Sequence, residues 1–199
     1  MNSLPEHLQG LNEQQLEAAQ HYLGPILILA GAGSGKTRVL TRRVASLILD
    51  QGIRPRNILA VTFTNKAAEE MKERLGKLLG TQGKELWVAT FHSACLRILR
   101  HNAHLLGYSN DFAVYDDNDC KTLMKNLIRE QGIDEKKNPP ESFLRTIDWC
   151  KNNFESPEQY AKRAHLYDKK VSADIYDQYQ RALLKANAMD FGDLLYNTV

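Results

Sequence analysis

The stretch AGAGSGKT, residues 30–37, contains the residue types that bind a chain of phosphates. Its glycines let the backbone approach closely, so that several main-chain N–H groups can line phosphate oxygens at once. Lys36 adds a positive charge, and the Thr37 hydroxyl can ligate Mg²⁺. An apolar run, ILILA (26–30), precedes the stretch, and a helical pattern follows it, so that a positive helix N-terminus would point at the anion. This order predicts a site for a nucleoside triphosphate such as ATP.

The stretch departs from the usual G-x-x-x-x-G-K-[ST] pattern at one position, where Ala30 replaces a glycine. Gly31 and Gly33 keep the loop permissive, and the strand–loop–helix context supports the match. The competing interpretation is a glycine-rich turn followed by a chance Lys-Thr pair, which this context disfavours. We therefore expect the phosphates to contact the loop between its first glycine and its lysine, at Ala32, Gly33, Ser34 and Gly35.

The elements around this loop repeat in a regular order. Three apolar runs predict buried strands, at 26–30, 58–63 and 87–91. Each is followed by a helical pattern, from Lys36 toward Gly52, over 65–79, and from the third strand to near Gly107. Strand–helix units that repeat in this way predict a parallel sheet with crossover helices.

A further helix is predicted ahead of the first strand. Asn12 can cap it, and Gln15 stands three positions later, at the spacing of a capping box. Leu16, Ala19 and Leu23 mark one face, and Gly24-Pro25 is expected to end the helix.

After residue 110 the sequence becomes mostly helical. FAVY (112–115) is the one further strand-like run, and Asp116 is placed to cap the helix that follows. Helices are also predicted from Pro140 to about Asn152 and from Pro157. A long final helix has Val171, Ile175 and Tyr179 at four-residue spacing. We expect this part to be a helical subdomain inserted after the third strand.

Composition and charge exclude several classes of protein. The formal net charge is +2, with basic residues in excess before residue 110 and acidic ones in excess after it, which is only a weak indication of nucleic-acid contact. The three cysteines have no metal-binding spacing, so buried, unreactive thiols are expected. His101 and His104 have no carboxylate or thiol partner nearby in the sequence. Without a long apolar run or a signal-peptide pattern, we expect a cytoplasmic protein with no membrane partner.

Five segments together resemble a known family. LNEQQLEAA (11–19), AGAGSGKTRVL (30–40), AVTFTNKAAEEMKERL (60–75), ATFHSACLRIL (89–99) and MDFGDLL (189–195) occur in this order. They look like successive motifs of the UvrD/Rep/PcrA family of superfamily 1 DNA helicases. The resemblance covers essentially the whole chain, most closely over residues 11–107 and more loosely over 110–188.

The resemblance implies an α/β fold of the P-loop NTPase, RecA-like type. Residues 1–110 would form part of the nucleotide-binding domain, 111–188 the inserted helical subdomain, and 189–199 the return into the first domain. It also implies that Gln15 reads the adenine edge, although Gln15 can complete the capping box as well. Arg38 would pack on the adenine face, where a guanidinium can stack; a solvent-facing helix residue is the alternative.

The same resemblance implies a site for single-stranded DNA at TFTN (62–65). An aromatic residue at the end of a strand, Phe63, can stack on a base, and Thr64 and Asn65 can donate to phosphate. The alternative for Phe63 is simple packing in the core. His92, in TFHS (90–93), resembles a residue that links the DNA and nucleotide sites, and a structural role is an equal alternative.

Two further patterns resemble sites of other enzymes. VYDD (114–117) offers a strand that ends in carboxylates, but its apolar run is short and it opens the helical part. Asp-Phe-Gly (190–192) occurs in protein kinases, but no H-R-D catalytic loop precedes it. We assign neither pattern a catalytic role.

The activity implied is that of an ATP-dependent, 3′→5′ translocase on single-stranded DNA and at duplex junctions. The family's D-E-x-Q-D-type motif and its second motor domain are expected beyond residue 199, so these 199 residues should bind nucleotide and hydrolyse it at background rate. A helicase–nuclease subunit of the AddA or RecB kind, a P-loop kinase, and a non-catalytic binding module stay open as alternatives. Protein partners cannot be read from the sequence.

Overall fold

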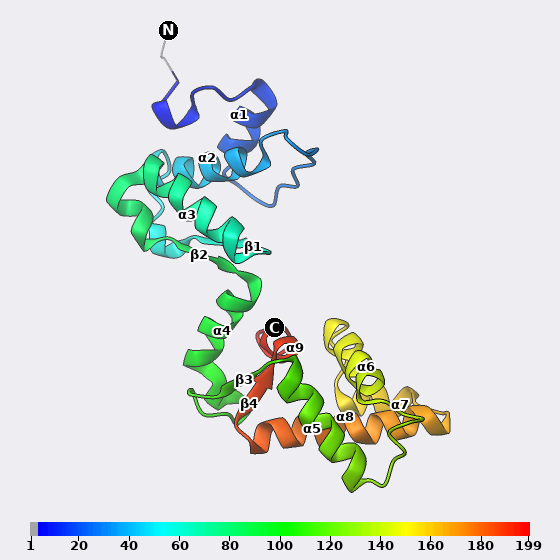
Figure 1. The fold of residues 1–199 in the computed structure, drawn as a ribbon. Coiled ribbons are helices and arrows are strands. Elements are labelled where there is room, and N and C mark those ends of the chain that lie inside the picture. The colour runs from blue at the N-terminus through cyan, green and yellow to red at the C-terminus, as the bar shows by residue number, and fades with distance from the viewer. Residues whose placement is uncertain (1–3) are drawn as a thin grey trace. The chain divides into compact units, whose positions relative to one another are not determined.

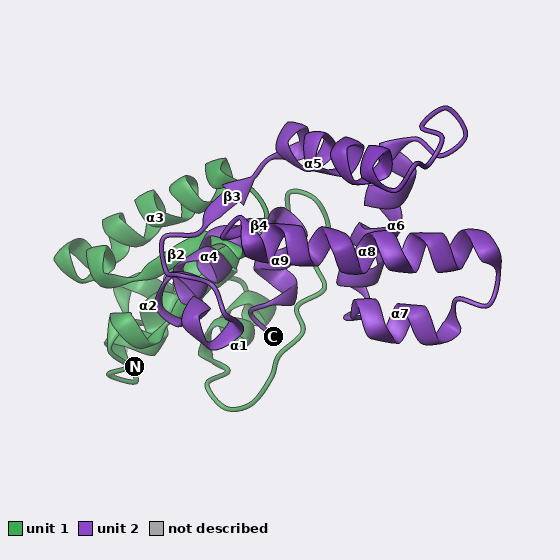
Figure 2. Ribbon diagram, turned by 90° about the horizontal axis from the view of Figure 1, so that it is seen from below, with its two compact units in different colours: residues 1–91 green, residues 92–199 purple. Residues whose placement is uncertain are grey.

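The computed structural model describes residues 4–199. The chain divides into two compact units, and the boundary falls between Phe91 and His92 (Figure 2). Both units contain helices and a pair of parallel strands, so the chain is an α/β protein, as the sequence predicts. None of the helices among residues 4–199 is long and apolar enough to cross a membrane.

The first unit contains the predicted phosphate loop and the first strand pair (Figure 1). Its regular elements are α1 (Glu13–Gln20), α2 (Lys36–Leu49), β1 (Leu59–Thr62), α3 (Asn65–Leu79) and β2 (Trp87–Thr90), with short 3₁₀ helices at Glu6–Leu8, Pro55–Asn57 and Gly80–Glu85. β1 and β2 are parallel, with Leu59 opposite Trp87 and Thr62 opposite Thr90. Parallel neighbours need a long crossover connection, and α3 provides it. These elements confirm the strands predicted at 58–63 and 87–91 and the helix predicted at 65–79.

The core of the first unit lies between two helices and the strand pair. The apolar faces of α2 and α3 supply most of the buried side chains, which is the arrangement that their helical spacing predicts. The cluster comprises Val44, Ala45, Ile48, Ala68, Met71, Leu75, Leu79, Leu86 and Val88. Leu75 has no exposed surface at all.

Side-chain caps fix where α1 and α3 begin. Asn12 and Gln15 form the predicted capping box at the start of α1, and the Thr64 hydroxyl accepts a hydrogen bond from the Ala67 N–H at the start of α3. Each cap satisfies an N–H group that the helix itself leaves without a partner. On the surface of α3, Lys72 and Glu69 form an ion pair, with 2.8 Å between Lys72 Nζ and Glu69 Oε1.

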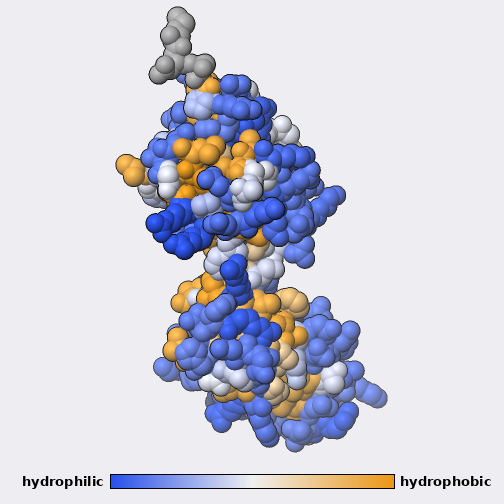
Figure 3. Space-filling model, turned by 90° about the vertical axis from the view of Figure 1, so that its left-hand side faces the viewer, coloured by the Kyte–Doolittle hydropathy of each residue, from blue (hydrophilic) through white to orange (hydrophobic). Residues whose placement is uncertain are grey.

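Two predictions for this unit are wrong. The run 26–30 has no regular secondary structure, and Leu27 and Leu29 are 83% and 87% exposed. A strand needs a neighbour on its hydrogen-bonding edge, and among the described residues β1 pairs only with β2, so the expected third strand of the sheet is absent. The first helix likewise ends at Gln20, before Leu23, which is exposed. Apolar side chains therefore reach the surface of this unit, as they also do on the face seen in Figure 3.

The second unit is mostly helical. Its elements are α4 (Phe91–Asn102, whose first residue belongs to the first unit), a 3₁₀ helix at Ala103–Leu106, β3 (Ala113–Tyr115), α5 (Asp117–Glu130), α6 (Pro140–Asn152), α7 (Pro157–Arg163), α8 (Tyr167–Lys185), β4 (Ala188–Asp190) and α9 (Phe191–Tyr196). β3 and β4 are parallel neighbours although they lie far apart in sequence. α5–α8 lie between these two strands in the sequence, as Figure 1 shows. The predicted helical texture after residue 110 is confirmed.

Two cores hold the second unit together. The larger one joins α5, α6, α7 and α8, and Tyr176 and Tyr179 of α8 are completely buried in it. The smaller one joins α4 to β4 and α9 through Leu99, Met189 and Leu194, among others. β4 and α9 are therefore held in two ways, because β4 pairs with β3 and both elements pack against α4.

Two of the three cysteines, Cys120 and Cys150, bear out the expectation of buried, unreactive thiols. All three are free; Cys120 and Cys150 are buried and Cys95 is half-buried. Burial raises the pKa of Cys120 to about 11 and that of Cys150 to about 12. A thiol reacts as its thiolate, so these two are inert at neutral pH.

Candidate nucleotide and nucleic-acid sites

The loop between residues 30 and 36 has the backbone that a phosphate cradle needs. Gly33 and Gly35 adopt positive φ values of 76° and 85°, a region that favours glycine. Gly35 is the N-cap of α2, so the N-terminus of that helix opens directly onto the loop. A side-chain Cβ placed at Gly31 or Gly33 would meet no atom within 4 Å, so the space above these residues is open.

The polar side chains of the loop are held by the loop's own carbonyl groups. Lys36 Nζ donates to the carbonyl oxygens of Ala30, at 3.0 Å, and Gly31, at 2.8 Å. Ser34 Oγ donates to the same Gly31 oxygen at 2.8 Å. Lys36 is exposed and Thr37 is half-buried at the first turn of α2. A phosphate oxygen is a stronger partner for an ammonium group than a neutral carbonyl, so Lys36 is free to change partners.

Gln15 and Arg38 both lie beside the loop. Gln15 completes the capping box of α1 with Oε1, which leaves its Nε2 to donate to the Ser34 carbonyl at 3.0 Å. A Cβ at Gly35 would lie 3.2 Å from this same Nε2 and 3.9 Å from Arg38 Cβ. The Arg38 guanidinium lies over Gly10, where a Cβ would come within 2.7 Å of Nη2. The structure thus brings Gln15 and Arg38, the two residues for which the family resemblance implies adenine contacts, next to Gly35 of the loop.

A second cluster of candidate residues forms where β1 and β2 end. The carboxyl ends of parallel strands meet at one edge of a sheet, and there the rings of Phe63 and Phe91 pack at 5.6 Å between centroids with a 58° tilt. Phe63 is 92% exposed and Phe91 is also exposed, so core packing does not explain Phe63. Thr64 and Asn65, at the N-terminus of α3, are exposed beside this pair.

His92 belongs to the second unit. It is exposed in the first turn of α4, and its ring meets the ring of Phe191 edge to face, with 5.8 Å between centroids. Phe191 is half exposed and opens α9. His101 and His104, by contrast, are surface residues on and after α4, and the described residues include no cluster of side chains suited to a metal ion.

Sequence reasoning missed three contributors to these sites. Gly10, Phe91 and Phe191 were not singled out, although Phe91 and Phe191 occupy matching positions, each directly after a short parallel strand. That placement is the signal that could have found them. The carboxylates of VYDD and Asp-Phe-Gly have a structural use, because Asp116 and Asp190 are the N-caps of α5 and α9.

A model of the UvrD/REP helicase N-terminal domain family matches residues 11–199. The chain therefore belongs to this family. It is similar to the ATP-dependent DNA helicase PcrA of Bacillus subtilis, with 46% identity over 192 residues, or 96% of this chain and 26% of that protein. It is also similar to the ATP-dependent DNA helicases PcrA of Staphylococcus aureus and Staphylococcus epidermidis, at 45% and 43% identity over all 199 residues and 27% of each relative. The chain thus spans about a quarter of the length of these relatives.

Proposed function

We propose that the chain is the ATP-binding part of an ATP-dependent DNA helicase that moves 3′→5′ along single-stranded DNA. The observation that carries the proposal is the loop at residues 30–37, with open space above Gly31 and Gly33 and an exposed lysine whose ammonium is bound to neutral carbonyl oxygens of the loop. The relatives named above are ATP-dependent DNA helicases, and this supports the choice of ATP and DNA as ligands.

The nucleotide would be held from two sides. Main-chain N–H groups at Ala32, Gly33, Ser34 and Gly35 would bind phosphate oxygens at the N-terminus of α2. Lys36 would then leave its carbonyl partners for the β- and γ-phosphates, and Thr37 would ligate Mg²⁺. Gln15 and Arg38 would contact the adenine, because both already lie beside Gly35. Bound Mg²⁺ would neutralise phosphate charge and polarise the γ-phosphate.

Single-stranded DNA would bind at the exposed aromatic residues. Bases stack on aromatic side chains without strong sequence preference, and the Phe63–Phe91 pair offers such a surface at the sheet edge. Thr64 and Asn65 would donate to the DNA backbone. In the second unit, His92 and its neighbour Phe191 offer a further contact. The whole helicase would also act on duplex junctions. It would do so in the cytoplasm.

The pairing of β3 with β4 supports the domain organisation inferred from the sequence. Residues 113–115 and 188–190 are neighbours, and the helices α5–α8 form an excursion between them. We propose that 1–110 and 189–199 belong to one RecA-like domain and that 111–188 is a helical subdomain inserted into it.

Binding measurements test the proposal. We expect the 199-residue chain to bind Mg-ATP, and to bind a single-stranded oligonucleotide with an affinity that falls steeply as salt rises. A P-loop kinase would bind ATP but would show no such DNA affinity, and a non-catalytic docking module would bind no ATP. Failure to bind Mg-ATP at millimolar concentration would overturn the proposal.

Turnover of ATP tests a separate part of it. The 199 residues contain no D-E-x-Q-D-type motif, so we expect hydrolysis at background rate even when ATP is bound. Robust turnover that disappears in Lys36→Ala would show that the chain holds a complete catalytic site.

A further inference from the structure

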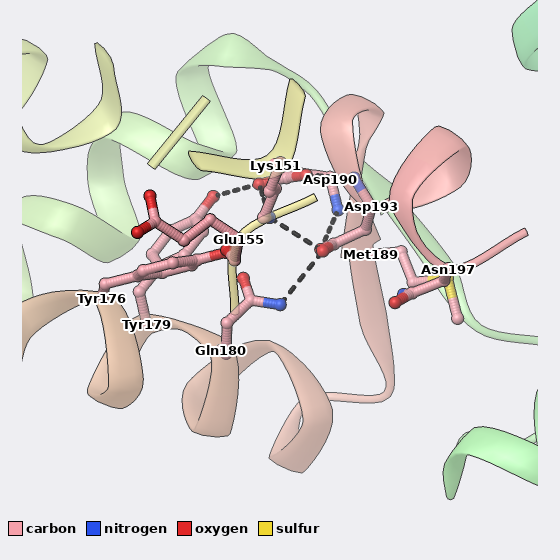
Figure 4. Close-up of polar contacts among 9 residues, drawn as sticks. All are labelled: Lys151, Glu155, Tyr176, Tyr179, Gln180, Met189, Asp190, Asp193 and Asn197. Atoms are coloured by element: carbon pink, nitrogen blue, oxygen red, sulfur yellow. Dashed lines mark hydrogen bonds and ion pairs between the residues drawn. The ribbon is translucent and has the colours of Figure 1, made fainter. Parts of the chain in front are cut away.

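Lys151, on α6, is a buried cation outside both candidate sites. Its side chain is 1% exposed, and its ammonium lies 2.7 Å from Asp190 Oδ2 and 2.8 Å from Asp193 Oδ1 (Figure 4). The side chains of Asp190 and Asp193 are themselves 13% and 0% exposed. Burying a charge is costly unless the charge is paired and hydrogen-bonded, so this cluster has to be complete to be stable.

Each of the four carboxylate oxygens has a partner. Asp190 Oδ1 and Asp193 Oδ2 form a reciprocal capping box with each other's main-chain N–H groups, at 2.8 and 3.1 Å. The other two oxygens face Lys151, and each accepts a second bond from α8: Tyr179 donates to Asp190 at 3.0 Å, and Gln180 donates to Asp193 at 3.0 Å. Gln180 makes this bond although its own Oε1 is buried and has no partner within the described residues. The turn at 190–193 is thereby fixed from α6 and from α8.

Gly192 makes room for the lysine. A Cβ at this position would lie 3.0 Å from Lys151 Cδ and 3.3 Å from Asp190 Oδ1. Any larger residue would therefore crowd Lys151 against its carboxylates. The absence of a side chain at position 192 and the presence of the lysine at 151 are matched to each other.

Capping alone does not require the lysine. Asp116 and Asp119 form the same two-aspartate box at the start of α5, where both side chains are exposed and no ion pair joins them among the described residues. The box at 190–193 differs in that it is buried and encloses Phe191, whose ring contacts His92. The additional cation therefore serves the placement of this particular turn.

We propose that Lys151 is a positioning residue that ties α6 to the turn at 190–193 and so sets the placement of Phe191 against His92. The inference deepens the proposed function, because it assigns Lys151 to the support of that DNA-contacting pair. In the proposed domain organisation, Lys151 also links the inserted helical subdomain to the returning segment. A change in the placement of α6 would then move Phe191.

Nuclear magnetic resonance of the His92 ring tests the positioning directly. An aromatic ring shifts the resonances of protons beside it, so Phe191→Ala gives the His92 signal in the absence of the Phe191 ring. We expect Lys151→Met to move the His92 signal toward that reference. Lys121→Met, which removes a half-exposed lysine of the same unit that pairs with Glu141, should leave the signal unchanged.

Two further variants keep the test decisive if Lys151→Met does not fold. Lys151→Met with Asp193→Asn preserves the net charge of the cluster and the capping geometry, and Gly192→Ala preserves all its charges while it crowds Lys151. Both should displace the His92 signal, the second by less. If the folded variants keep the wild-type signal, Lys151 only stabilises the unit and the proposal is overturned.

Affinity for single-stranded DNA separates this inference from the proposed function. We expect Lys151→Met to lower the affinity about three- to tenfold, as partial loss of one base–aromatic contact would do, and Lys121→Met to change it by less than about twofold. If Phe191→Ala itself leaves the affinity unchanged, the DNA contact at this pair is wrong, while the resonance measurement still decides the role of Lys151.

Discussion

Two lysines of this molecule, Lys36 in the first unit and Lys151 in the second, have the same chemistry and opposite surroundings. Lys36 is exposed and bound to two neutral carbonyl oxygens of its own loop. Lys151 is buried between two carboxylates that are themselves held by a capping box and by α8. The Lys36 ammonium is therefore accessible to a phosphate, whereas the Lys151 ammonium is shielded from solvent. Burial and the identity of the partners, and not residue type, distinguish the proposed binding lysine from the proposed positioning lysine.

The largest expected effect on stability comes from removing the buried cation, Lys151. Lys151→Met should lower the free energy of unfolding of the second unit by about 3–5 kcal/mol, since two buried carboxylates lose their cation. Denaturant unfolding measures the loss, with Lys121→Met as the control of equal charge change. A loss below about 1 kcal/mol would mean that Lys151 is not held as tightly as its contacts indicate.

The carboxyl groups of Asp190 and Asp193 determine how the stability lost in Lys151→Met depends on pH. Burial alone would raise the pKa of Asp190, but the Lys151 ammonium and the hydrogen bonds around it hold that pKa below its usual range. Its stabilising contribution is therefore complete above the unfolded pKa of 3.8 and is lost as pH falls through the lowered folded value. Burial raises the pKa of Asp193 despite Lys151, so Asp193 acts in the opposite sense. Tyr179 stays protonated because burial raises its pKa far above the usual range.

Removal of Lys151 takes the cation away from both carboxyl groups. Without the cation, the buried carboxyl groups should protonate at a higher pH in folded Lys151→Met than in the folded wild type. The deficit of the variant should thus be greatest near neutral pH and should shrink as pH falls toward the lowered pKa of Asp190 in the wild type. Unfolding curves of both proteins across this range provide the measurement. A deficit that grows toward acidic pH would contradict the assignment of Asp190 as the ionised partner.

The open lysine should matter for ligand binding and little for folding. Lys36→Ala is expected to weaken Mg-ATP binding by roughly tenfold to a hundredfold, through loss of charge-assisted bonds worth about 1.5–3 kcal/mol. Its melting temperature should stay close to that of the wild type. Lys77→Ala, at an exposed lysine paired with Glu73, is the matched control for both measurements. Equal ATP affinity in the two variants would remove the distinction between the lysines.

The exposed aromatic pair gives a smaller and more specific effect. Phe63→Ala should weaken binding of single-stranded DNA by about 1–3 kcal/mol, the range for one base–aromatic stack, without changing the salt dependence. Tyr167→Ala removes another strongly exposed ring, at the start of α8 in the second unit, and should have no effect. Fluorescence anisotropy of a labelled oligonucleotide at two salt concentrations compares them. Equal losses in both variants would indicate a general effect of aromatic surface.

The smallest expected effect concerns the backbone of the loop. Gly33→Ala should lower the free energy of unfolding by about 1 kcal/mol because Gly33 has a positive φ. Gly31→Ala should be nearly neutral, since a Cβ there meets no atom within 4 Å and φ is not positive. Thermal unfolding of the pair isolates the backbone cost from any loss of contacts.

Local patterns predict much of this fold. The capping box at Asn12, the helix from Asn65 and the strands around Val61 and Val88 depend on neighbours in sequence, and all are present. The strand at 26–30 failed because its formation depends on a partner strand, which an apolar run cannot specify. A short apolar run carries no information on whether anything covers its two faces.

The candidate sites divide in the same way. The phosphate loop is contiguous in sequence, so its residues could be identified together, and Gln15 could be linked to it only through the family resemblance. The Lys151 cluster joins residues about 40 positions apart, and Lys151 looks in the sequence like any other helical lysine. Gly192 gave no indication of its role, because a close approach across the fold leaves no local pattern.

Residues 26–30, directly before the phosphate loop, form no strand, so their amide exchange rates should respond to nucleotide binding. Without ladder hydrogen bonds among the described residues, the amides of 26–30 should exchange with deuterium within seconds, while those of the β1–β2 ladder stay protected. If bound nucleotide draws the Lys36 ammonium away from the Ala30 carbonyl, the segment 26–30 loses the hydrogen bond at its carboxyl end. Exchange rates there, followed during a titration with nucleotide, would record the motion of the loop without a chemical probe attached to the protein.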